Sequence, residues 1–248
     1  MPPARLSDPR DRRERAGRIL DVAGDLLLRW GYRRVTIEDI ARYADIGKGT
    51  VYLHWKTRDE LFGAVFDREV LAAVAELLAA LRQDPRGWLP HRLARSYFLA
   101  IMSRPLLRGL FLADAEMLGK LARPSNDSRD MRHHLVSRAY FELLAEHGVL
   151  HPDLSTEATA YGFLATLEGF IRSESTADQQ HGLDLQKRSE LLARTVQRAF
   201  ETRQRVSPAT TKAIACRVIG LFSNLAEADR ADLDLAGENS PSLQTMGA

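Results

Sequence analysis

The fold is decided by residues 36–55, which read TIEDIARYADIGKGTVYLHW. Thr36 precedes Asp39 by three residues, the spacing of a capping box, and the apolar residues around them recur with the period of a short helix. Residues 45–47, Asp-Ile-Gly, interrupt that helix, and a second one is predicted over residues 48–55. Two short helices joined by so tight a turn indicate a helix-turn-helix unit, whose second helix can enter the major groove of DNA.

The second helix of this unit has distinct inner and outer faces. At about 100° per residue, Val51 and Trp55 point together into a small core. The remaining surface is small, polar and aromatic rather than uniformly charged, which suits contact with base edges. The residues predicted to contact DNA from this surface are Gly49, Thr50, Tyr52, Leu53 and His54.

Candidate phosphate ligands surround this surface. Lys48 begins the second helix and Lys56 follows it. Thr36 and Thr57 stand at helix starts, where backbone N–H groups can bind phosphate. Taken singly, each residue also has a structural explanation, because both threonines are good helix caps and the aromatic side chains can be ordinary surface groups.

The segment around this unit resembles the DNA-binding domain of the tetracycline-repressor (TetR) family. The resemblance rests on Gly31-Tyr32, on residues 36–41, and on residues 44–61, ADIGKGTVYLHWKTRDEL; it covers roughly residues 12–65. It departs from the family at Gly47, where serine is common and would cap the helix, and at Trp55, which replaces the usual phenylalanine.

The resemblance implies three small helices for DNA, a linking fourth helix and a divergent helical body for ligand binding and dimerisation. It also implies phosphate contacts for Tyr52 and Lys56. The residues that fall where family members touch DNA are Thr36, Lys48, Gly49, Thr50, Tyr52, His54 and Lys56.

The whole chain is predicted to be all-α, with about ten helices bounded by capping, proline and glycine signals. We expect an N-terminal arm and helix-turn-helix domain over residues 1–57. A helical effector-binding and dimerisation domain is expected over residues 58–226, its first helix (58–81) linking the two. The polar residues 176–182 are predicted to form a loop, and the acidic and polar residues 227–248 a disordered tail.

The predicted body contains aromatic and flexible apolar side chains of the kind that adapt to small apolar ligands. Each of these side chains can equally be an ordinary core residue. The candidate pocket residues are Phe98, Met102, Leu110, Met117, Tyr140, Phe163 and Leu167.

A homodimer is expected, because family members usually pair their last long helices into a four-helix bundle. Helices near residues 155–174 and 184–205 are long and amphipathic enough for this role. Two-fold symmetry would place the recognition helices ~34–36 Å apart, which matches a palindromic double-stranded DNA operator. Glu168 and Arg172 are either an ordinary intrahelical ion pair or a buried specificity element.

Composition excludes several other classes of protein. A chain with 45% hydrophobic and 27% charged residues is typical of a folded globular protein. No stretch without a charged residue is longer than ten residues, which predicts no membrane span and no membrane partner. The first 18 residues hold six arginines and three acidic residues without the apolar segment of a secretory signal. We therefore expect a cytoplasmic protein with an anionic partner.

No enzymatic or metal-binding constellation is apparent in the sequence. His147 and His151 are separated by a helix-ending glycine, and the adjacent His133 and His134 cannot converge from one helix face. The single cysteine, Cys216, excludes a disulfide framework and is expected to be a small buried hydrophobic residue. No enzyme activity, cofactor or metal site is predicted.

These observations favour a transcriptional regulator, most simply a repressor released from a palindromic operator by a small-molecule effector. The alternative is a DNA-binding regulator whose helical body binds a protein partner or no ligand.

Overall fold

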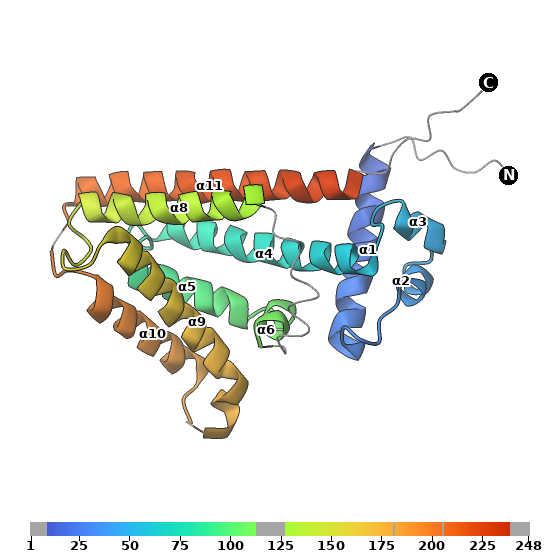
Figure 1. Ribbon diagram of the computed structural model, residues 1–248, viewed down its shortest axis with the longest axis horizontal. Coiled ribbons are helices and arrows are strands. Elements are labelled where there is room, and N and C mark those ends of the chain that lie inside the picture. Colours follow the sequence, from blue (N-terminus) through green and yellow to red (C-terminus); the bar gives the residue numbers. More distant parts are fainter. Residues whose placement is uncertain (1–8, 113–126, 181, 205, 239–248) are drawn as a thin grey trace. The chain divides into compact units, whose positions relative to one another are not determined.

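The computed structural model describes residues 9–112, 127–180, 182–204 and 206–238 (Figure 1). Within these residues every regular element is a helix, which confirms the predicted all-α fold. The helices are α1 (Pro9–Trp30), α2 (Ile37–Tyr43), α3 (Lys48–Tyr52), α4 (Arg58–Gln83), α5 (Pro90–Met102), α6 (Pro105–Leu112), α8 (Asp127–Glu146), α9 (Thr156–Gln180), α10 (Leu185–Phe200) and α11 (Pro208–Glu238).

The chain divides into two compact units. One boundary crosses α4 between Glu69 and Val70, and another crosses α11 between Asp229 and Arg230. The first unit contains α1, α2, α3 and the start of α4, and the second contains the helices from the rest of α4 to most of α11. No described helix combines the length and the apolar composition that crossing a membrane requires.

In the first unit, local sequence signals set the helix ends. Gly31 has a φ of +76°, which glycine adopts without strain, and its N–H donates to the carbonyl of Leu27 at 3.0 Å to end α1. Thr36 begins α2 with the predicted capping box. Gly47 begins α3 without a side-chain cap, as its lack of a hydroxyl requires.

A cluster of side chains ties the loop after α1 to the start of α4. The Tyr32 hydroxyl donates to Asp59 Oδ1 at 2.6 Å, and its ring meets Phe62 edge-on at 5.3 Å. The Arg58 guanidinium lies 4.6 Å from the centre of the Tyr32 ring and donates to the Val35 carbonyl at 3.4 Å. Desolvation raises the pKa of Tyr32, so its hydroxyl remains a donor to Asp59.

The second unit is built around α5, α9 and α10, which pack against one another (Figure 1). Phe98 from α5 and Leu192 and Val196 from α10 are fully buried in its core. The Glu201 carboxylate, which follows α10, accepts from the His91 backbone N–H at 2.6 Å and lies 2.8 Å from the His91 Nδ1. This contact fixes the start of α5 against the end of α10.

Several predicted helix ends differ from the structure. α3 ends at Tyr52, three residues before the predicted end. α9 continues to Gln180, so the prediction of a loop from residue 176 is wrong; no proline or glycine interrupts the chain before Gly182, whose φ is +58°. α11 continues to Glu238 rather than ending near residue 226, because the acidic segment is rich in helix-compatible alanine.

Two further expectations are settled by exposure. Cys216 is exposed, so the prediction that it is buried is wrong. The buried face of α11 passes through Ile214, Ala215 and Val218, which turns Cys216 outward. Glu168 and Arg172 form an ordinary surface pair, with the Arg172 Nη2 2.7 Å from the Glu168 Oε1 and both side chains more than half exposed; such pairs contribute little to stability.

Gly162 on α9 should be required for the contact with α10. A Cβ at this position would lie 2.8 Å from Cε1 of Phe200, closer than packed atoms allow. We predict that Gly162→Ala lowers the free energy of unfolding by about 1–3 kcal/mol, measured by chemical denaturation. The control is Gly220→Ala in α11, where a Cβ meets nothing within 4 Å; it should be neutral or stabilise by up to about 1 kcal/mol. Equal effects of the two variants would contradict the packing argument.

Candidate nucleic-acid interface and ligand cavity

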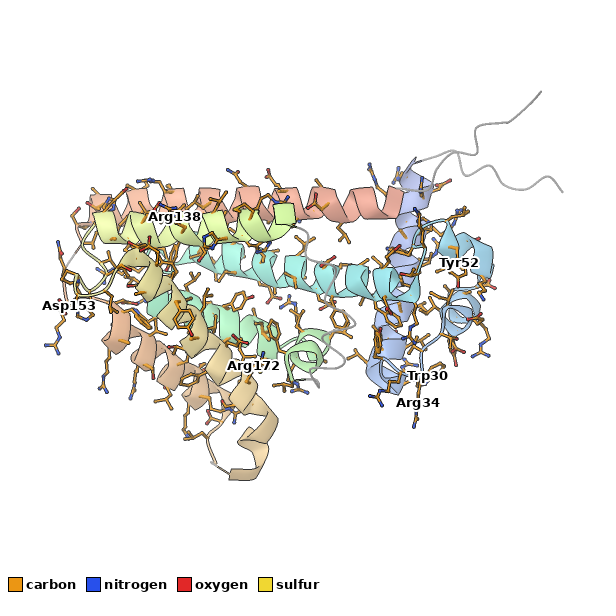
Figure 2. All side chains as sticks on the ribbon, viewed as in Figure 1. Trp30, Arg34, Tyr52, Arg138, Asp153 and Arg172 are labelled. Atoms are coloured by element: carbon orange, nitrogen blue, oxygen red, sulfur yellow. The ribbon has the colours of Figure 1, made fainter. Side chains whose placement is uncertain are left out.

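α3 exposes one face and buries the other, as predicted. Val51 and Trp55 are buried in the first unit. Lys48 and Gly49 are exposed, Thr50 is half-buried, and Tyr52 and Leu53 are 41% and 39% exposed. Tyr52, the last residue of α3, is labelled in Figure 2. The helix therefore presents small, cationic, aromatic and apolar groups together on one exposed surface.

His54 does not belong to this exposed surface. Its side chain is only 4% exposed, and its ring lies 5.3 Å from that of Trp55. The prediction of an outward His54 assumed that α3 continues to Trp55. α3 instead ends at Tyr52, and the imidazole is buried beside Trp55.

Lys48 is linked to α2 and to its own helix. Its ammonium forms an ion pair with the Glu38 carboxylate and lies 5.7 Å from the centre of the Tyr52 ring. The hydrogen bond from Lys48 holds the pKa of Glu38 below its ordinary value, and the same bond raises the pKa of Lys48. The sequence reasoning missed Glu38, because no local signal reveals a pair of residues ten positions apart across the turn.

The Thr36 side chain caps the start of α2. Its Oγ1 accepts from the Asp39 N–H at 3.1 Å and donates to Asp39 Oδ2 at 2.6 Å. The hydrogen bond from Thr36 is the main cause that lowers the pKa of Asp39. The position of Thr36 at the start of α2 is thus explained by local structure alone.

The start of α4 carries the other predicted phosphate ligands. Thr57 Oγ1 accepts from the Glu60 N–H at 3.1 Å, and Glu60 Oε2 accepts from the Lys56 N–H at 2.8 Å. The side chains of Lys56 and Thr57 are exposed. The Thr57 hydroxyl hydrogen and the Lys56 ammonium therefore remain accessible to an anion.

The second unit contains a cavity of about 390 Å³, within the usual range of small-molecule sites. Side chains from α4, α5, α8, α9 and α11 line it. Most are aliphatic or aromatic, and the polar ones are His133, His134, Ser137 and the tyrosines Tyr97 and Tyr140.

Three of the seven predicted pocket residues line this cavity: Tyr140, Phe163 and Leu167. Phe98 and Met102 are buried in the core and are not among the residues that line this cavity. The side chain of Leu110 and all of Met117 lie outside the described residues. Helical periodicity identified buried positions but not which of them border an empty space.

The two adjacent histidines of α8 do not form a metal site with their neighbours. His133 Nε2 lies 2.8 Å from Asp229 Oδ2 of α11, and Arg132 Nη2 lies 3.2 Å from the other oxygen of the same carboxylate. In the part of the chain that the structure describes, no group of three or more histidine, cysteine or acidic residues is placed to hold a metal ion.

The helix-turn-helix segment is similar to that of known regulators. Residues 19–65 match the family described as "Bacterial regulatory proteins, tetR family". An uncharacterized HTH-type transcriptional regulator of Mycobacterium bovis is 31% identical over 118 residues, which span 48% of this chain and 58% of that protein. An HTH-type transcriptional repressor of Mycobacterium tuberculosis is 41% identical over 59 residues, 24% of this chain and 31% of that protein.

A similar fold is found in a solved structure of NalD, the secondary repressor of the MexAB-OprM multidrug efflux pump in Pseudomonas aeruginosa. Its TM-score is 0.57, with 19% identity over 77% of this chain and all of that one. The N-terminal helix-turn-helix segment, residues 19–65, is therefore similar to the DNA-binding segment of the TetR family. Both mycobacterial relatives are transcriptional regulators rather than enzymes, and this chain matches just over half the length of the M. bovis protein.

The ion pair between α2 and α3 can be tested by titration. We predict that Lys48→Met raises the pKa of Glu38 towards its ordinary value, because the hydrogen bond that favours the ionised carboxylate is lost. Carboxyl-detected NMR measures this change. The pKa of Asp39, lowered mainly by Thr36, is the internal control and should not change. The pair persists at neutral pH and is lost as the pH falls through the folded-state pKa of Glu38. An unchanged Glu38 pKa in the variant would exclude the pair in solution.

Proposed function

We propose that this protein is a homodimeric transcriptional regulator that binds a palindromic operator through α3 and responds to a small-molecule effector in the second unit. The observation that carries the proposal is the exposed surface of α3, which stands on the segment that matches the TetR family. The M. tuberculosis relative is named a repressor, and we propose the same direction of control here. Binding to the bacterial chromosome would place the protein in the cytoplasm.

Base contact and phosphate contact are assigned to different side chains. Gly49 allows close backbone approach, and Thr50, Tyr52 and Leu53 can reach base edges or a thymine methyl group. Lys56 and the Thr57 hydroxyl are suited to phosphate, because both are exposed and their donors are accessible. We do not assign DNA contacts to the buried His54 or, at side-chain level, to the capping Thr36.

The position of the Lys48 ammonium is restricted, because it is paired with Glu38. Its ion pair with Glu38 holds the ammonium beside the Tyr52 ring, so the charge is positioned before DNA arrives. The same acid reduces the positive potential of the surface, which weakens binding to unrelated sequences. We propose that the Glu38–Lys48 pair favours selectivity over total affinity.

The cavity supports a small-molecule effector over the alternative of a body without a ligand. A space of about 390 Å³ with an apolar lining is large enough for a small organic molecule. Switching operator occupancy from 99:1 to 1:99 requires about 10⁴-fold preference of the effector for the released state. In the proposed dimer, the released state would be one in which the two α3 helices lie at a different distance from each other than in the DNA-bound state.

The exposed apolar residues support α9 as the centre of the dimer interface. Tyr161 is 77% exposed and Leu164 is 52% exposed on this helix. Both line a groove between α8 and α9, and α8 exposes Met131 and Leu135. By contrast, Leu191 is the only large apolar side chain exposed along α10, which the structure describes throughout. We therefore propose α8 and α9, rather than the expected α9 and α10, as the dimerising pair.

The DNA-binding surface is tested by footprinting on the intergenic DNA beside the gene, at several salt concentrations. We predict that Lys56→Ala reduces the magnitude of the slope of log K against log salt by about 1.8 for the dimer, because each of the two subunits loses one phosphate contact. Leu53→Ala should leave that slope unchanged and reduce the preference for the operator over a scrambled duplex by about fivefold or more.

The matched control for charge is Lys187→Ala, an exposed lysine of α10. It should change neither the slope nor the preference. A wild-type protein that protects no DNA at low salt would overturn the proposal, and equal slopes for wild type and Lys56→Ala would overturn the assignment of Lys56.

The dimer interface is tested by placing a charge on each candidate helix. Tyr161→Glu should increase the dissociation constant of the dimer at least about tenfold, because a carboxylate would be buried against an apolar surface. Leu191→Glu on α10 is the matched control and should leave the dimer intact. Analytical ultracentrifugation measures both, and dissociation caused by Leu191→Glu alone would move the interface to α10.

A further inference from the structure

Two tyrosines line the cavity, and their hydroxyls differ in their hydrogen bonds. The Tyr140 hydroxyl donates to the Trp88 carbonyl at 2.8 Å, so the fold already uses it. The Tyr97 hydroxyl, in contrast, has no hydrogen-bond partner among the described residues. The half-buried Tyr97 hydroxyl is thus available to donate a hydrogen bond to a ligand in the cavity.

The Tyr97 hydroxyl is a donor rather than an anion. Desolvation raises the pKa of Tyr97, so the phenol keeps its proton at neutral pH. Tyr97 comes from α5 and does not line the surface groove between α8 and α9. His134 and Ser137, by contrast, line both that groove and the cavity. The phenol is therefore the donor best placed to fix a ligand within the cavity.

The rest of the lining limits the charge of the ligand. None of the described lining residues is an aspartate, glutamate, lysine or arginine. The Asp229 carboxylate contacts one of the lining histidines, but it is already bound to that residue, His133, and to Arg132. An ammonium in the cavity would meet no carboxylate among these residues, and a phosphate would meet only the two histidines, so the burial of either charge is unfavourable.

We propose that the cavity binds an uncharged, mainly apolar molecule whose carbonyl oxygen accepts a hydrogen bond from the Tyr97 hydroxyl. This inference rests on the effector site proposed above and specifies the chemical class of its ligand. The apolar walls supply most of the affinity, and the single hydrogen bond supplies orientation and selectivity.

The test measures ligand binding to the purified full-length protein without DNA. Displacement of a bound fluorescent apolar dye gives affinities for 2-undecanone, 1-chlorodecane, decyltrimethylammonium and decyl phosphate. The wild-type protein should prefer the ketone. Tyr97→Phe should weaken ketone binding about five- to tenfold and change chloroalkane binding by less than about twofold.

Tyr140→Phe is the matched control, because it also removes a tyrosine hydroxyl from the cavity wall. It should lower the melting temperature, since the Trp88 carbonyl loses its donor, but leave the ketone affinity within about twofold. Equal ketone affinities for wild type and Tyr97→Phe, or tightest binding of the ammonium or the phosphate, would overturn the assigned ligand class while leaving an effector site in place.

Absence of displacement by all four probes would overturn both the ligand class and the proposed effector site. DNA binding is decided separately by footprinting, so a failure there does not affect the ligand measurement. The two proposals can therefore fail independently.

Discussion

Helix α3 has only five residues, and a helix of that length is not stable by itself in water. Its geometry depends on the burial of Val51 and Trp55 on its inner side, which fixes the direction of the outer side. The contacts of Tyr32 with Asp59 and of Arg58 with Val35 hold the neighbouring loop and the start of α4. The exposed surface that would read DNA is therefore a consequence of packing behind it, and Trp55 serves the site without touching DNA.

The second unit shows a different balance between dense packing and open space. Its core includes the fully buried Phe98 and Leu192, yet a cavity remains beside Tyr97 and Tyr140. Empty apolar space forfeits dispersion contacts and lowers stability. The proposed guest molecule would fill this space and bond the unused Tyr97 donor, which would recover part of that stability.

Much of this architecture could be predicted from local sequence signals. The capping box at Thr36, the positive φ of Gly31 and the inward positions of Val51 and Trp55 all follow from rules that act within a few residues. The burial of His54 beside Trp55 was not predicted by the helical phase of α3.

Features that depend on tertiary contacts could not be predicted in this way. The Glu38–Lys48 pair joins two helices across a turn, and the cavity is bordered by residues from five helices. Hydrophobic periodicity placed Phe98 and Tyr140 in the interior alike, but only the three-dimensional arrangement separates a filled position from one beside a void. The polar residues before Gly182 were misjudged because polarity alone does not end a helix.

The outward position of Cys216 on α11 has a practical consequence. It is the only cysteine in the sequence, and its thiol is accessible. A maleimide or nitroxide reagent would therefore attach once per polypeptide, at a defined place on a long rigid element. In a symmetric pair of subunits the two labels would report a single intersubunit distance, giving spectroscopy a direct gauge of conformational change without further mutation.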